Sequence, residues 1–201
     1  MFLFCEIAMF SLLYAHPYGR HSYVNQHLIK AVNALDSFDL RDLYQAYPDF
    51  YINVKQEQLA LQESALIIMQ FPVQNAYPPS LLVQYINKVF CQGWAWGVNE
   101  QQQPTQMLAN KILLVVLSGL ERDDCDGVDN AKQKLQLVLQ PLQHLAQQCG
   151  MQFAAPILLP LRHLLFDQEL AKIATQYQQN VQQLLQQHIL QQQSVQQDSE
   201  A

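Results

Sequence analysis

The sequence predicts an α/β fold, a three-layer sandwich in which helices cover both faces of a five-stranded parallel sheet. Short apolar runs alternate with longer amphipathic segments along the chain, which is typical of βαβ units. Two of the runs, Lys111–Ser118 and Gln152–Leu158, are apolar almost throughout, as strands buried on both faces should be. With 201 residues, half of them apolar, the chain fits one domain with a substantial core.

The first strand is expected over Met9–Ala15. The apolar stretch Met1–Tyr14 begins the chain but has no positively charged start, and Glu6 interrupts it, so a buried strand explains it better than a secretory signal. Met9 is a candidate natural start. We therefore expect a domain over 9–181, an N-terminal extension over 1–8 and a glutamine-rich tail over 182–201. No other stretch has the roughly 20 apolar residues that cross a bilayer.

The remaining elements follow from the spacing of apolar residues. Further strands are expected over Phe38–Asp42, Ala65–Phe71, Lys111–Ser118 and Gln152–Leu158, with helices between them over about Ser22–Leu35, Val54–Glu63, Ser80–Phe90 and Asn130–Cys149. Ser22 is a candidate N-cap and Gly150 a candidate left-handed end, whereas Pro141 should bend or divide its helix. A last helix should begin near Asp167 and run into the tail, as a frayed helix or as disordered chain.

The composition argues against several partners. A net charge of -6 offers no broad attraction to nucleic acid or to an anionic membrane surface. The four cysteines are scattered, without a C-x-x-C pair or a histidine at zinc-ligand spacing, so no metal site is expected. Free thiols in a reducing cytosol fit this pattern.

In a doubly wound sheet, ligands bind at the carboxyl ends of the strands, so the loops after the first, third and fourth strands are the candidate site. The first loop, His16–Asn25, leads into a helix N-terminus, which favours a phosphate. Because the chain has neither G-x-G-x-x-G nor a Walker loop, a mononucleotide is the simpler ligand. On the residues alone, Ser22 is also explained as a helix cap and His16 as a strand-end residue.

Six short motifs carry a resemblance to a known family. They are Tyr-Ala-His-Pro-Tyr at 14–18, His-Ser-x-x-Asn at 21–25, Asp-Leu-Tyr-x-x-Tyr-Pro-Asp-Phe at 42–50, Gln-x-Pro-x-Gln at 70–74, Asn-Lys-Val-Phe at 87–90 and Gly-Trp-Ala-Trp-Gly at 93–97. With them the chain resembles, over nearly its whole length, the flavodoxin-like NAD(P)H:quinone oxidoreductases. Within that family it is most similar to the ancillary subunits of glutathione-gated potassium efflux systems.

The resemblance implies a cytoplasmic homodimer that holds FMN across the strand ends. NAD(P)H and a quinone or other electrophile would alternate at the flavin in two-electron, ping-pong hydride transfer, with no catalytic side chain assigned. Docking on the cytoplasmic face of a potassium efflux transporter would place the protein at the inner membrane. The flavin contacts carried over are His16, Ser22, Tyr23, Val24, Asn25, Val73, Gln74, Asn75, Ala76, Leu117, Ser118, Gly119 and Leu120.

The chain departs from the family at the ring end of this site. Relatives have a Trp-Tyr pair where this chain has Asn75-Ala76, a second glycine where it has Leu120, and a neutral loop where 121–130 is acidic. These changes predict weaker flavin binding, because apolar contact is lost and a leucine side chain competes for space beside the ring. They favour an alternative function, a non-catalytic dimer acting as a regulatory interaction subunit, or a site for another phosphate compound.

Several conspicuous residues have simpler interpretations. Trp94 and Trp96 are expected to pack in a tight loop, and His144 and His163 to be structural or exposed rather than catalytic. Cys91, the thiol nearest the predicted cleft, has no feature in the sequence that indicates a lowered pKa. The resemblance implies that Tyr85 and Lys88, on the helix after the third strand, lie at the dimer contact.

Overall fold

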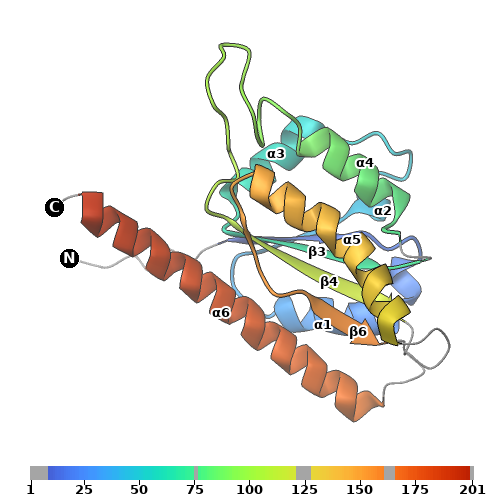
Figure 1. The fold of residues 1–201 in the computed structure, drawn as a ribbon. Coiled ribbons are helices and arrows are strands. Elements are labelled where there is room, and N and C mark those ends of the chain that lie inside the picture. Colours follow the sequence, from blue (N-terminus) through green and yellow to red (C-terminus); the bar gives the residue numbers. More distant parts are fainter. Residues whose placement is uncertain (1–8, 75–76, 121–127, 161–165, 200–201) are drawn as a thin grey trace.

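A computed structural model describes residues 9–74, 77–120, 128–160 and 166–199 of the chain. A parallel sheet in the order β2-β1-β3-β4-β5 forms the middle layer, and a further short strand, β6, pairs with β4 (Figure 1). The strands are β1 Phe10–Tyr14, β2 Phe38–Asp42, β3 Leu66–Pro72, β4 Ile112–Leu120, β5 Gln152–Phe153 and β6 Ile157–Pro160. The α/β fold predicted from the sequence is confirmed.

Helices cover both faces of this sheet. On one face lie α1 (Tyr23–Val32) and α6 (Asp167–Ser199), and on the other lie α2 (Leu43–Ala46), α3 (Val54–Glu63), α4 (Ser80–Val89) and α5 (Val128–Gln148) (Figure 1). A single 3-10 turn, η1 (Gly19–His21), precedes α1. The central strands alternate between the two layers: Leu13, Met69 and Val115 pack toward α4 and α5, whereas Leu12, Ile68 and Leu114 pack toward α1 and α6.

Two sequence expectations about single elements are corrected. The fifth strand is not continuous, because the chain leaves the ladder after β5 and returns as β6. Pro156 stands in this gap and has no N–H to donate to a ladder. Of the two effects expected of Pro141, division of the helix is excluded, since α5 continues through it from Val128 to Gln148, and a bend stays a prediction. Pro141 lies on the exposed side of α5, where the carbonyl that loses its partner can be hydrated.

A buried ion pair joins β2, α3 and α4. Glu57 is almost fully buried, and the Arg41 guanidinium donates to both of its carboxylate oxygens, at 2.6 Å from Nε and 2.5 Å from Nη2. The hydroxyls of Tyr47 and Tyr85 also donate to this carboxylate, the latter at 2.8 Å. Burial alone would raise the pKa of Glu57, but these hydrogen bonds hold it below its usual value.

The interpretation of Tyr85 as a dimer contact is wrong, because its side chain is wholly buried within the chain. Of the two residues expected at the dimer contact, Tyr85 and Lys88, only Lys88 is exposed.

The tryptophans of the 93–97 motif are packing residues, as expected. Trp94 and Trp96 both lie against the core beside α4 and α5, and the Trp96 indole donates to the Phe90 carbonyl at 2.9 Å. No helix in the described part of the chain has the length and apolarity needed to cross a membrane.

The helix α6 is held to the sheet over most of its length and then runs past it (Figure 1). Its buried side follows Leu170, Tyr177 and Val181, and His188 and Ile189 farther along the helix are half-buried. His188 packs near Lys111, whose ammonium donates to the carbonyls of Gln62 and Ser64 at 2.7 Å each.

The His188 contact predicts a pH dependence of stability. Burial and the nearby Lys111 charge lower the pKa of His188. Its Nδ1 is buried without a hydrogen-bond partner among the described residues, and a backbone hydrogen bond at Asn110 only partly opposes the shift. Because the folded chain binds this proton less readily than the unfolded chain, stability should be lost as the pH falls below about 6.5, by at most about 1.4 kcal/mol per pH unit.

Urea unfolding between pH 5 and 7.5 checks this expectation. His188→Gln should flatten the dependence on pH in this window, whereas His144→Gln, which removes an exposed imidazole from α5, should keep it. Because burial also lowers the pKa of His16, part of the slope should remain in His188→Gln; a slope as steep as that of the wild type would contradict the assignment to His188.

Candidate functional site

The candidate site lies where the loops after β1, β3 and β4 meet at the carboxyl ends of the strands. The α1 helix begins there, directly after η1, with Ser22 at the N-cap position. Ser22 makes no capping hydrogen bond to a backbone N–H of the first turn of α1; its hydroxyl oxygen accepts instead from the Asn25 side-chain amide at 2.8 Å. The partial positive charge of that terminus and its backbone N–H groups favour an anion such as a phosphate.

A buried polar network holds these loops together. The Asn25 side-chain amide donates to the hydroxyl oxygens of Ser22 at 2.8 Å and Ser118 at 3.0 Å. The Gln70 amide on β3 donates to the Asn25 side-chain oxygen at 2.8 Å, and the Tyr177 hydroxyl on α6 donates to Gln70 at 3.4 Å. All except Ser22 are nearly or wholly buried. The network therefore fixes α1 against β3 and β4 at the site.

The loops after β3 and β4 approach each other closely at Gly119. The Val73 N–H donates to the Ser118 carbonyl at 2.8 Å, and Gly119 has a φ of 80°. A Cβ at position 119 would lie 3.3 Å from the Val73 carbonyl oxygen. A side chain here would be strained by the backbone conformation and would crowd the loop after β3. Glycine is thus required at position 119 by the close approach of the two loops.

The structure shows which of the expected contact residues have side chains that are already engaged elsewhere in the protein. Ser22, Asn25 and Ser118 are already hydrogen-bonded to one another, and Val24 and Leu117 belong to the core. Tyr23 points toward α6, where its hydroxyl donates to Asp167 at 3.4 Å and its ring lies against His27. Most of these positions therefore offer a ligand their backbone groups rather than their side chains.

Gln74 forms a backbone bridge with Tyr77, with N···O distances of 2.9 and 3.2 Å. Tyr77 is 73 % exposed and lines the cleft beside this loop. It supplies an aromatic ring beside the loop after β3, which the sequence pattern did not reveal. Asn75, Ala76 and the side chain of Leu120 lie outside the described residues.

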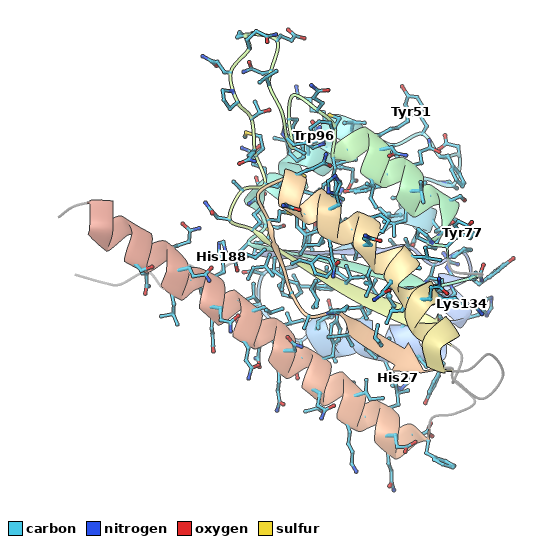
Figure 2. The ribbon with its side chains drawn as sticks, in the orientation of Figure 1. His27, Tyr51, Tyr77, Trp96, Lys134 and His188 are labelled. Atoms are coloured by element: carbon cyan, nitrogen blue, oxygen red, sulfur yellow. The ribbon has the colours of Figure 1, made fainter. Side chains whose placement is uncertain are left out.

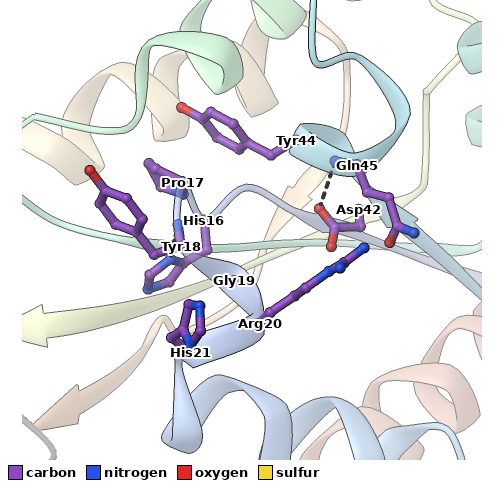
Figure 3. Close-up of a pocket in the computed structure, with 9 residues that line it drawn as sticks. All are labelled: His16, Pro17, Tyr18, Gly19, Arg20, His21, Asp42, Tyr44 and Gln45. Atoms are coloured by element: carbon purple, nitrogen blue, oxygen red, sulfur yellow. Dashed lines mark hydrogen bonds between the residues drawn. The ribbon is translucent and has the colours of Figure 1, made fainter.

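Two adjoining clefts open at this end of the sheet. One, of about 350 Å³, lies between the loop His16–His21 and the end of β2, where Asp42, Tyr44 and Gln45 line it (Figure 3). The other, of about 270 Å³, runs from Pro17 and Tyr44 to Gln74, Tyr77 and the start of α4. Because Pro17 and Tyr44 line both, the clefts form one trough across the ends of β2, β1 and β3.

His16 and Gly19 shape the first cleft. The Tyr18 N–H donates to His16 Nδ1 at 3.1 Å, and burial lowers the pKa of His16, so the imidazole is neutral near pH 7. Gly19 packs directly on the Tyr14 ring, which a Cβ would approach to 2.8 Å. The loop can therefore lie low over the strand ends. No three histidine, cysteine or acidic side chains gather as metal ligands within the described ranges.

The sheet order β2-β1-β3-β4-β5, with helices on both faces, defines a doubly wound α/β protein of the flavodoxin type. The chain belongs to the Flavodoxin_2 family, described by its flavodoxin-like fold, whose model matches residues 11–187. The family resemblance read from the sequence is thereby confirmed.

A curated relative is the glutathione-regulated potassium-efflux system ancillary protein KefF of Enterobacter sp. (strain 638). It is 34 % identical over 173 residues, which cover 86 % of this chain and 95 % of the relative. A solved structure described as a thermophilic tryptophan halogenase from Streptomycin violaceusniger is 28 % identical, with a TM-score of 0.73 over 85 % of this chain and 97 % of that one. The general stress protein 14 of Treponema denticola in complex with FMN is 24 % identical, with a TM-score of 0.74 over 88 % and 99 %. The three relatives carry different names. The two solved structures share the fold with this chain.

Proposed function

We propose that this protein is an FMN-dependent NAD(P)H:quinone oxidoreductase. The observation that carries the proposal is the meeting of two features at one sheet edge: the α1 N-terminus free of a side-chain cap, and the Gly119 backbone lying against Val73. The first suits the FMN phosphate and the second suits a flat ring. The Asn25–Gln70–Ser118 network holds the α1 N-terminus and the loop of Gly119 at a fixed spacing.

When bound, FMN supplies the hydride chemistry, accepting two electrons from NAD(P)H and passing them to the quinone. The residues of the chain would bind FMN and orient its ring. Backbone N–H groups at 23–25 would hold the phosphate, and the backbone of Val73 and of 118–119 would lie beside the ring. Tyr77 and Tyr44 would wall the trough and keep water from its apolar side. No side chain of the site is needed as a general acid or base.

Similarity to an ancillary protein of a potassium-efflux system extends the proposal to partners. The protein would act as a homodimer on the cytoplasmic face of a potassium efflux transporter, with quinones or other electrophiles as acceptors. A second candidate, a non-catalytic regulatory dimer, is favoured by one observation: the side-chain amide of Asn25 donates to Ser22 and to Ser118, so neither of its N–H groups is free for a ligand.

Flavin retention distinguishes these functions. After incubation with excess FMN and desalting, the wild-type chain should keep about one flavin per chain in its absorbance spectrum and should oxidise NAD(P)H when a quinone is added. Gly119→Val should raise the FMN dissociation constant at least about tenfold, equivalent to about 1.4 kcal/mol, because its side chain occupies the space beside Val73.

Gly97→Val is the matched control, since Gly97 also has a positive φ, of 81°, but lies in the tryptophan loop outside the two clefts. Its strain should lower stability without changing flavin affinity in the folded fraction. Absence of wild-type binding in titrations up to high micromolar FMN would overturn the reductase and support the regulatory dimer.

A further inference from the structure

The end of α6 carries apolar surface that no described part of the chain covers. Leu184 and Leu185 pack on the core cluster that α6 shares with the sheet, whereas Leu190, farther along the helix, is 65 % exposed. The helix continues past the sheet at this end (Figure 1). A hydrogen bond from the Gln152 side chain to that of Gln191, at 3.1 Å, holds the helix beside the start of β5. Leu190 is therefore an apolar side chain at a place where a further segment can pack.

The chain enters the sheet beside this end of α6. Phe10, the first residue of β1, belongs to the core cluster on which α6 packs. Just before it, the Met9 carbonyl accepts from the Ala65 N–H at 2.8 Å. The family model matches residues 11–187, so residues 1–8 and the end of α6 both lie outside the match. These two segments therefore meet the sheet at the same edge, formed by the amino ends of the strands.

Residues 1–8 have a composition suited to packing on that surface. Their sequence is Met-Phe-Leu-Phe-Cys-Glu-Ile-Ala, in which Glu6 is the only charged side chain. From Ile173 to Gln197 the helix has no Asp, Glu, Lys or Arg, so an apolar segment lying on it takes no helix charge out of water. Eight extended residues span up to about 26 Å, and the helix from Leu184 to Ser199 rises about 22 Å. The segment is therefore long enough and apolar enough to cover the end of α6.

A cation at this edge complements the charge of Glu6. Lys111, directly before β4, donates to the carbonyls of Gln62 and Ser64 at 2.7 Å each, and no described carboxylate lies within ion-pair distance of it. An ammonium has three donors, so one is left for a carboxylate. β4 lies two strand spacings, about 10 Å, from β1. Three extended residues, from Met9 back to Glu6, span about the same distance.

We propose that residues 1–8 form a strap that crosses the amino ends of β3 and β4, pairs Glu6 with Lys111 and covers Leu190 at the end of α6. The strap holds a stretch of helix that has few core contacts of its own and otherwise frays. It lies at the opposite ends of the strands from the flavin cleft. The strap thus goes beyond the proposed function and does not depend on it.

The test measures hydrogen exchange of the full chain at pH 7, read by mass spectrometry. Replacing both Leu3 and Phe4 by aspartate should accelerate exchange of the amides at 189–197 at least about tenfold, because two apolar anchors of the strap are lost. Exchange in β1 and α1 should stay unchanged, which shows that the variant folds. Phe166→Asp is the matched control: it removes a 79 % exposed ring before the other end of α6 and should leave exchange at 189–197 as in wild type.

The ion pair is tested separately. Glu6→Gln should accelerate exchange at 189–197 about threefold, within the range of a partly exposed pair. In a Lys111→Met background the same change should have no further effect, because the partner of the carboxylate is already gone. An equal acceleration by Glu6→Gln in both backgrounds would overturn the route of the strap past β4.

Two other results would overturn the strap as a whole. One is unchanged exchange at 189–197 in the folded Leu3→Asp and Phe4→Asp variant. The other is wild-type protection that is lost when the protein is diluted, because the end of α6 is then covered by a second copy of the chain. Protection that is independent of concentration and disappears in the variant supports the strap, whether or not the chain retains FMN.

Discussion

Replacing Glu57 by glutamine should lower the free energy of unfolding by about 3–5 kcal/mol, the usual effect of removing one partner from a buried ion pair. The variant keeps the shape of the side chain but removes its charge. Arg41, whose side chain is 16 % exposed, is then left with only Asp39, at 2.9 Å. Hydrogen bonds from Tyr47 and Tyr85 to a full carboxylate are weakened at the same time. Urea unfolding at pH 7 measures the change.

Two further variants test the cause. Glu63→Gln removes the same charge from an exposed position at the end of α3 and should change the free energy of unfolding by less than about 0.5 kcal/mol. Combining Glu57→Gln with Arg41→Met should restore part of the loss, because the unpaired cation is removed as well. Additive losses in the double variant would contradict a coupled pair.

The same carboxyl group predicts an acid dependence. The folded-state pKa of Glu57 is below its usual value, so its contribution is fully present above the unfolded pKa of about 4.3. That contribution is lost as the pH falls through the folded pKa. Wild type should therefore lose stability below about pH 4 more steeply than Glu57→Gln.

Apolar periodicity in the sequence predicted those helices and strands in which the pattern repeats over the full length of the element. The strand Phe38–Asp42 and the helix Val54–Glu63 have the predicted bounds, since each has an apolar pattern of full length between clear breaks. The helix α2 was missed because its four residues show no period, although Asp42 before it is a capping residue. The division of the fifth strand was missed because Pro156 stands inside an otherwise apolar run.

Contacts between residues far apart in the sequence account for the features that could not be predicted. Glu57 is a single charged residue in an amphipathic helix, and no local pattern shows that Arg41, Tyr47 and Tyr85 surround it. In the candidate site, the rule that ligands bind at strand ends selected the loops after β1 and β3, which line the two clefts, but it did not select the end of β2; among the described residues, the loop after β4 lines neither cleft. It did not show that Asn25 donates to Ser118, 93 residues away, or that Arg20 turns toward Asp42. The labelled side chains of Figure 2 show how widely the polar and aromatic residues are spread over the fold.

Substituting leucine for Asn25 should both destabilise the fold and lower flavin retention. The Gln70 amide loses its 2.8 Å acceptor and keeps only the Asn25 carbonyl at 3.4 Å, inside a wholly buried site. A buried donor left in this way costs about 1–3 kcal/mol, and the Ser118 hydroxyl loses a partner as well. We therefore expect the free energy of unfolding to fall by about 2–4 kcal/mol, measured by urea unfolding.

The effect on flavin follows from what the network connects. Asn25 on α1 is bonded to β4 through Ser118 and to β3 through Gln70, so its loss frees the helix terminus from the two loops that approach each other at Gly119. FMN retention after desalting should fall at least about tenfold, since phosphate and ring contacts no longer hold a fixed spacing. Asn33→Leu, at the exposed end of the same helix, should leave retention unchanged.

A double-mutant cycle separates the network from simple loss of a polar residue. Gln70→Leu alone leaves the Asn25 oxygen without its donor, whereas the pair Asn25→Leu and Gln70→Leu removes both buried polar groups together. The loss of stability in the double variant should therefore be smaller than the sum of the two single losses by about 1 kcal/mol or more, while flavin retention stays low. Recovery of flavin with recovered stability would show that the network serves the core and that the loops hold their spacing without it.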